Sequence, residues 1–196
     1  MWKYLYKNWA YMGPIIAIYV TFMLLTDAAL SYPLLLLWLQ FPIYALHEFE
    51  EHAWPGGFKE FVNQHIFKVR TAEAPLTPAR VFWLNISVIW ILFPVAALLA
   101  QKIHPAFGLF LPCFSLVNAT LHIVFFIALR KYNPGLVMSL FLNYPTGLYT
   151  LKIAQDAGLL PMPALLGSFL LSIVLHALML LLCFYWYKQF KKTQNA

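Results

Sequence analysis

Charged residues and cysteine are scarce in this chain. Asp, Glu, Lys and Arg together make up 10% of its 196 residues, whereas soluble domains contain about 25%. The two cysteines, Cys113 and Cys183, each lie alone in an apolar run without a CxxC partner. The sequence therefore indicates neither a disulfide framework nor a thiolate metal site, and we interpret both cysteines as small buried side chains.

Acidic residues are fewer than basic ones, and the net charge is +6. Nucleic-acid-binding proteins can carry such a charge, but they gather basic residues on one face or arm. Here the basic residues separate long apolar runs, so we expect no nucleic-acid partner. Hydrophobic residues make up 62% of the chain, and this composition predicts an integral membrane protein surrounded by membrane lipids.

Several segments are long and apolar enough to cross a bilayer, which takes about 20 mainly apolar residues. The sequence predicts an all-α fold, in which residues 1–196 form a single domain of about six transmembrane helices. Their ranges are 9–26, 29–51, 81–100, 106–129, 135–151 and 159–187. In the long connection, residues 52–80, a Trp-Pro-Gly-Gly run at 54–57 is expected to end the second helix. The segment after this run resembles a short amphipathic element at the membrane surface.

Basic residues are distributed unevenly between the two sides of this arrangement. With the N-terminus in the cytoplasm, the cytoplasmic segments hold all but two of the thirteen basic residues. These are Lys3, Lys7, Lys59, Lys68, Arg70, Arg80, Arg130, Lys131, Lys188, Lys191 and Lys192. Lys102 and Lys152 fall on the other side. Because cytoplasmic loops are enriched in Lys and Arg, both termini are predicted to be cytoplasmic.

Ionisable side chains gather in the run His-Glu-Phe-Glu-Glu-His at residues 47–52, at the cytoplasmic end of the second predicted helix. On a helix, His47 shares a face with Glu50 and Glu51, because residues three and four apart are neighbours. Imidazole and carboxylate one turn apart can bind a divalent metal or hold a general acid next to a base. The run does not match HExxH, so zinc-protease chemistry is not transferred to it.

Two members of the run lie on a different face. Glu48 and His52 form their own pair four residues apart. We interpret them as solvated or headgroup-facing residues at the helix end. A purely structural alternative also applies to the other three residues, which could form an interfacial polar cap or join helices.

Polar residues of three predicted helices reach a similar depth. At 1.5 Å per residue, His47 lies roughly 6 Å inside the cytoplasmic boundary, Asn85 about 8 Å and His122 about 12 Å. Charged groups in the hydrocarbon cost about 2.5 to 3.5 kcal/mol or more at its centre, so such groups favour a pocket facing the bundle interior. We expect His176 to pack within the bundle, His65 to lie in the surface loop and His104 to be exposed.

A strong turn, Tyr132-Asn133-Pro134-Gly135, separates the fourth and fifth predicted helices. Tyr132 could donate to a carboxylate in the pocket or serve as an interfacial aromatic. With this turn, the chain resembles the HXXEE-domain membrane proteins, a prokaryotic family. The family pattern maps onto His47-x-x-Glu50-Glu51, a histidine of a later helix (His122), and the Tyr-x-Pro-Gly element. The resemblance implies one site with Tyr132 near it, in a prokaryotic plasma (inner) membrane, but no established activity.

Our leading hypothesis is an intramembrane enzyme that acts on a lipid-like or isoprenoid-like substrate. The expected metal ligands are His47, Glu50, Glu51 and His122, with Asn85 in support. Imidazoles and carboxylates suit zinc, iron or manganese better than calcium or magnesium.

Without metal, the two glutamates, His47 and Tyr132 would perform acid–base catalysis, since a buried carboxyl next to another has a raised pKa. Two other classes remain open. A proton- or metal-coupled transporter would use the polar residues for coupling, although transporter sites usually lie near the midplane between repeats. A structural or assembly subunit would use them to join helices, and the sequence names no protein partner.

Overall fold

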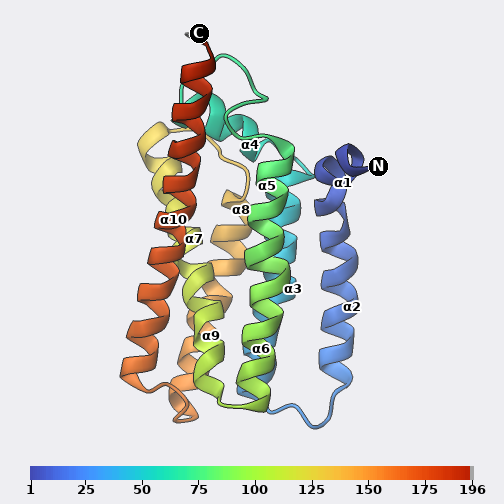
Figure 1. The fold of residues 1–196 in the computed structure, drawn as a ribbon. Helices are drawn as coiled ribbons and strands as arrows, with labels where there is room; N and C mark the ends of the chain where they lie inside the picture. Colours follow the sequence, from blue (N-terminus) through green and yellow to red (C-terminus); the bar gives the residue numbers. More distant parts are fainter. Residues whose placement is uncertain (195–196) are drawn as a thin grey trace.

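The computed structural model describes residues 1–194, and within that range every regular element is helical (Figure 1). The all-α prediction is therefore confirmed. The α-helices are α1 (Trp2–Asn8), α2 (Gly13–Thr26), α3 (Tyr32–His52), α4 (Phe58–Phe61), α5 (Pro78–Asn85), α6 (Phe93–Lys102), α7 (Phe110–Leu129), α8 (Leu136–Met138), α9 (Tyr144–Asp156) and α10 (Met162–Gln194).

Short 3₁₀ and π segments join several of these helices into longer rods. The 3₁₀ segment Trp9–Met12 joins α1 to α2, and the 3₁₀ segment Pro105–Leu109 leads into α7. The π segments Ile86–Leu92 and Ser139–Asn143 join α5 to α6 and α8 to α9. Each of these two π segments comes shortly before a proline, Pro94 or Pro145; a third π segment, Val62–Ile66, follows α4. A proline removes one backbone donor and crowds the carbonyl four residues earlier, and a local widening of the helix absorbs this conflict.

Four of the rods are long and apolar enough to cross a membrane: Trp2–Thr26, Pro78–Lys102, Pro105–Leu129 and Met162–Gln194. The outer surfaces of α2 and α10 expose large apolar side chains such as Phe22 and Leu181. Lipid rather than water is the solvent that suits these surfaces, so the chain is a membrane protein.

The other two rods are α3 and residues 136–156. At 21 residues α3 is long enough to cross a bilayer, but it includes Gln40, His47 and several glutamates. Such residues lower the mean hydropathy of a helix, and they are expected in a helix that faces protein rather than lipid.

Helix α3 is central to the bundle, because α2, α6, α7, α8 and α9 all contact it. Aromatic and small side chains of α3, α6 and α7 form the main core, with Phe93 between Tyr44, Phe110 and Phe114. In Figure 1, α2 and α10 lie on opposite sides of the bundle, and α10 packs along α7. From Gln40 onward most side chains of α3 are buried, and this burial brings its polar end into the protein interior.

The N-terminus and the C-terminal part of α10 lie at the end of the bundle that holds α4 (Figure 1). Helix α3 ends at His52, just before the predicted Trp-Pro-Gly-Gly break. The connection that follows folds back onto the bundle. Asn63 holds it together, since its amide donates to the carbonyls of Ala72 and Leu76 and accepts from the Leu76 N–H. We call the end of the bundle formed by this connection, residues 53–77, and by residues 47–52 the α4 end.

Candidate metal centre

The last two turns of α3 bring imidazoles and carboxylates into the protein interior at the α4 end. His47, Glu48 and Glu51 are buried, and so is His122 of α7. Buried ionised groups are costly unless they are paired, hydrogen-bonded or bound to metal. The partners of each group therefore show what the site can hold.

The first donor group consists of His47, Glu51 and His122. Glu51 Oε1 lies 3.1 Å from His122 Nε2 and 3.7 Å from His47 Nε2. The two imidazole rings are 4.9 Å apart and nearly perpendicular. The structure thus brings together three of the four residues expected to bind metal, two from α3 and one from α7.

Asn133 fixes the orientation and tautomer of His122. The Asn133 amide nitrogen donates to the backbone carbonyl of His122 at 3.0 Å, so its Oδ1 is the atom that faces His122 Nδ1. Nδ1 must therefore donate to Oδ1, and in the neutral ring Nε2 carries a lone pair. That lone pair faces Glu51 Oε1. Metal-binding histidines commonly have their second ring nitrogen held by such an outer partner.

Asn118 contacts His47 at the ring nitrogen that faces Glu51. Its Nδ2 lies 2.9 Å from His47 Nε2, which is 3.7 Å from Glu51 Oε1, and the Tyr44 ring packs against the imidazole. The sequence analysis did not identify Asn118. A signal was present, because Asn118 precedes His122 by four residues and so shares its helix face.

The second donor group consists of Glu48, Glu51 and His52. His52 Nε2 lies 3.3 Å from Glu51 Oε2 and 3.7 Å from Glu48 Oε2. The interpretation of Glu48 and His52 as solvated residues is wrong, since Glu48 is 1% exposed and the His52 side chain 6% exposed. His52 is covered by Trp9 and Phe58, whose rings lie 5.4 and 5.8 Å from its own ring.

Asn85 belongs to this second group rather than to the first. Its Nδ2 lies 3.0 Å from His52 Nε2 and also donates to the Val81 carbonyl. The bond to the carbonyl identifies this atom as the amide nitrogen, so His52 Nε2 accepts and carries the lone pair. Asn85 thus holds the His52 ring in place at the edge of the site.

Glu50 lies outside both donor groups. Its Oε1 accepts from the Tyr132 hydroxyl at 2.7 Å and from the Val137 N–H, and its Oε2 accepts from the Met138 N–H at 2.7 Å. These amides belong to the first turn of the 136–156 rod, where free N–H groups favour an anion. Partial burial and the bond to Glu50 raise the pKa of Tyr132, so the phenol remains a neutral donor.

The remaining histidines lie apart from the two donor groups. His176 of α10 packs against Phe114, with the two rings tilted, and hydrogen-bonds to the Ser172 carbonyl, so it packs within the bundle. His65 lies beside Lys131, with 3.1 Å between Nε2 and Nζ. His104 is exposed and accepts from the Ala106 N–H.

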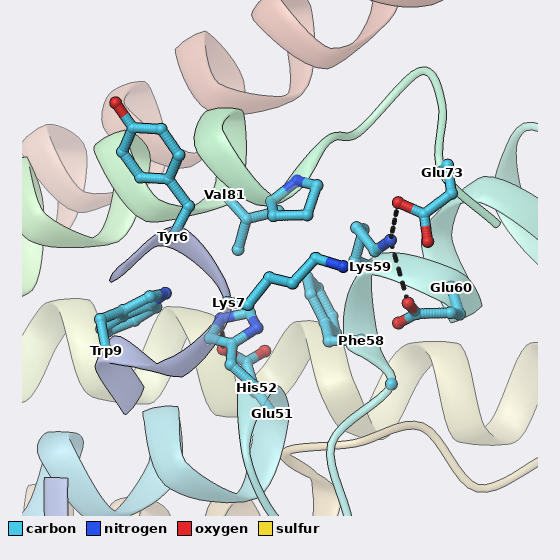
Figure 2. Close-up of a pocket in the computed structure, with 12 residues that line it drawn as sticks. Tyr6, Lys7, Trp9, Glu51, His52, Phe58, Lys59, Glu60, Glu73 and Val81 are labelled. Atoms are coloured by element: carbon cyan, nitrogen blue, oxygen red, sulfur yellow. Dashed lines mark ion pairs between the residues drawn. The ribbon is translucent and has the colours of Figure 1, made fainter. Parts of the chain in front are cut away.

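Two cavities meet at the donor groups. A polar pocket of about 230 Å³ is lined by Glu51, His52, Lys7 and Lys59 among others. Figure 2 shows Lys7 extending across this pocket, with Tyr6 and Trp9 on one side and Lys59, paired with Glu60 and Glu73, on the other.

The second cavity, of about 460 Å³, is mostly apolar. It runs between α5, the π segment Ile86–Leu92, α7 and α10, and Asn118 and His122 form part of its wall. Glu51, His52, Phe58 and Val81 line both cavities. The donor groups therefore separate a polar space from an apolar one.

A family model described as "Protein of unknown function with HXXEE motif" matches residues 38–150, more than half of the chain. The matched segment contains every residue of both donor groups, but not α10, which forms a wall of the apolar cavity. No curated protein and no solved structure gave a significant match. By the extent of the family match, the chain belongs to the HXXEE family.

Proposed function

We propose that this protein is an intramembrane, metal-dependent enzyme that acts on a lipid-like substrate. The observation that carries the proposal is that Glu51 and His122 of the first donor group line a large apolar cavity. Reactive groups beside a large apolar space are a common arrangement in enzymes with apolar substrates.

The metal part of the proposal rests on the facing lone pairs of His122 and Glu51. Asn133 leaves His122 Nε2 without a proton in the neutral ring, 3.1 Å from a carboxylate oxygen. Two lone pairs repel each other at this distance unless a cation or a proton lies between them. Two imidazoles and one carboxylate suit zinc, iron or manganese. A bound ion would polarise a substrate oxygen or lower the pKa of a bound water.

A proton between His122 Nε2 and Glu51 Oε1, in place of a metal ion, would give a metal-free version of the enzyme. His122 and Glu51 would then share that proton and exchange it with a substrate, as an acid–base pair. Residues and cavity are the same in both versions, so metal analysis separates them.

The substrate class follows from the two cavities. The apolar cavity has room for part of an acyl or isoprenoid chain, and its lining comes mainly from Leu, Ile, Val, Phe and Met. The pocket on the other side of Glu51 and His52 is lined by lysines and glutamates. An amphiphile with its tail in the first cavity would place its polar head at the donor groups.

We also propose six membrane spans with both termini in the cytoplasm of a prokaryotic cell, and insertion into its inner membrane. Six helical rods support the span count, and most basic residues lie in segments at the α4 end. Alkaline phosphatase fused to the C-terminus, which is active only outside the cytoplasm, is expected to be inactive.

The central test is a metal analysis of the full chain purified in detergent. We expect bound transition metal in the wild type, a lower metal content in His47→Ala, and the wild-type content in His104→Ala. His104 is the matched control because it is an exposed histidine outside both donor groups. Metal-free wild-type protein after incubation with zinc, iron or manganese would contradict the metal-dependent version and leave the acid–base one.

Lipid extraction from the same samples tests the substrate class. Mass spectrometry is expected to find an amphiphile that remains bound through detergent exchange. Complete loss of lipid during this exchange would count against a lipid-like substrate.

A further inference from the structure

The two oxygens of Glu51 face different donor groups. Oε1 faces His47 and His122, and Oε2 faces His52. From this arrangement we propose that the site binds two metal ions, with Glu51 as the bridging carboxylate. The first ion is the one of the proposed function, on which this inference rests, and the second is held by Glu48, Glu51 and His52.

Glu48 supplies the first argument for the second ion. Its Oε2 is buried and has no hydrogen-bond partner, and the nearest basic atom is His52 Nε2 at 3.7 Å. Because an unpaired charge in a buried position is costly, a carboxyl group there either takes up a proton or coordinates a metal ion. Glu50, two residues along, shows the contrast, because both of its oxygens accept short hydrogen bonds.

His52 supplies the second argument. Asn85 donates to its Nε2, so this atom bears no proton although it lies near oxygens of Glu48 and Glu51. Coordination of an ion by Nε2 would replace the hydrogen bond from Asn85. Three electron-rich atoms from three side chains meet here. A cation among them removes the repulsion and satisfies the orphaned Glu48 oxygen at once.

The spacing of the atoms agrees with coordination. Ligand atoms about 2.1 Å from one ion, and 90° to 109° apart around it, are separated by about 3.0 to 3.4 Å. The N···O separations of 3.1 and 3.7 Å in the first group, and 3.3 and 3.7 Å in the second, lie close to this range. Each ion would have three protein ligands, which leaves positions for water or substrate.

The second ion would give the polar pocket its chemical role. His52 and Glu51 line that pocket, whereas His122 lines only the apolar cavity. Two ions about 3.5 to 4 Å apart can hold both oxygens of one reacting group. The substrate class is thereby narrowed to amphiphiles whose head carries anionic oxygens, with the head at the two ions and the tail in the apolar cavity.

Metal counting tests the two ions separately. The full chain in detergent is stripped with a chelator, reloaded with excess Mn²⁺ and separated from free ion by gel filtration. We expect two ions per chain in the wild type and in His104→Ala, one in Glu48→Gln and one in His47→Ala. Glu51→Gln should lose both, because it removes the shared ligand.

Electron paramagnetic resonance gives a readout on the wild type that needs no variant. Two Mn²⁺ ions bridged by one carboxylate give an exchange-coupled spectrum, whereas a single ion gives the resolved hyperfine lines of isolated Mn²⁺. One ion per chain with an isolated spectrum, unchanged in Glu48→Gln, would overturn the second ion and leave the proposed function intact. Wild-type protein that binds no ion would overturn both.

Discussion

The backbone of Gly135 lies directly against the imidazole of His122. A Cβ atom at Gly135 would come 2.6 Å from His122 Cε1 and 2.9 Å from both Glu51 Cγ and His47 Cε1. The residue also has a φ of +98°, a conformation that side chains disfavour. The Tyr-Asn-Pro-Gly element thus closes the first donor group, since Asn133 and Gly135 contact it while Tyr132 holds Glu50.

Gly135→Ala is expected to abolish metal binding at the first donor group. The methyl group would displace His47, Glu51 and His122 together, and metal geometry tolerates little displacement. Gly158→Ala is the matched control: Gly158 also has a positive φ, but open space surrounds it. Both variants carry a backbone strain of about 1 to 2 kcal/mol. A lower metal content in Gly135→Ala than in Gly158→Ala would therefore be due to the steric contact of the methyl group and not to strain. Equal metal content in the two variants would contradict this role for Gly135.

Asn133→Leu is expected to weaken metal binding by about 10- to 100-fold, the usual effect of removing an outer partner of a metal-binding histidine. The leucine cannot accept the His122 Nδ1 proton, so the ring is free to rotate or change tautomer. Asn133→Asp retains an acceptor and should bind metal more tightly than Asn133→Leu. Competition with a chromophoric chelator measures both affinities, and identical values would show that Asn133 does not orient the ligand.

Glu50→Gln is expected to retain bound metal but to unfold at a lower temperature. The substitution replaces charge-assisted hydrogen bonds to the first turn of the 136–156 rod, and such bonds contribute about 1.5 to 3 kcal/mol each. Glu51→Gln, its neighbour, should lose the metal instead. Metal counts and thermal denaturation in detergent distinguish the two. Metal loss in Glu50→Gln would restore Glu50 as a ligand, as the sequence predicts.

The contrast between Glu50 and Glu51 shows where prediction from the sequence ends. Helical periodicity places His47, Glu50 and Glu51 on one face, and helix length places His122 at a similar depth. Both inferences use local geometry, and the structure brings His47, Glu51 and His122 together. Which glutamate meets the imidazoles depends on the rod that packs beside α3, because its free N–H groups bind Glu50.

Glu48 and His52 are wrongly interpreted as solvated because their burial depends on tertiary contacts. The sequence marks them as the end of a helix, where water or headgroups are the ordinary surroundings. The burial of His52 depends on Trp9, from the first rod, and on Phe58, from the folded-back connection. These contacts join distant parts of the chain, and no periodicity within one helix reveals them.

The hydrogen bond from Tyr132 to Glu50 predicts a stability difference that depends on pH. Burial and this bond raise the pKa of Tyr132 above its usual value of about 10. The phenol of the folded protein thus keeps its proton at pH values where the unfolded chain loses it. Its contribution to stability is full below about pH 10 and is lost as the pH rises through the folded pKa.

Tyr132→Phe should therefore melt below the wild type at pH 8, and the difference should shrink above about pH 10. Other titrating groups are common to both proteins and cancel in the comparison. Thermal denaturation in detergent across this range provides the measurement. A difference that stays constant with pH would show that the bond does not stabilise the fold.

The apolar cavity gives a paired prediction on α10. Ala177 lines the cavity, whereas its neighbour Leu178 is outside the lining and 55% exposed. Ala177→Trp is expected to fill much of the space and to reduce the bound amphiphile. Leu178→Trp adds the same ring on the lipid-facing surface, so it should leave the bound amphiphile unchanged. Both variants should retain metal, because neither residue contributes to a donor group. Lipid mass spectrometry and metal analysis of the same preparations test the pair, and equal lipid content in the two would place the amphiphile outside this cavity.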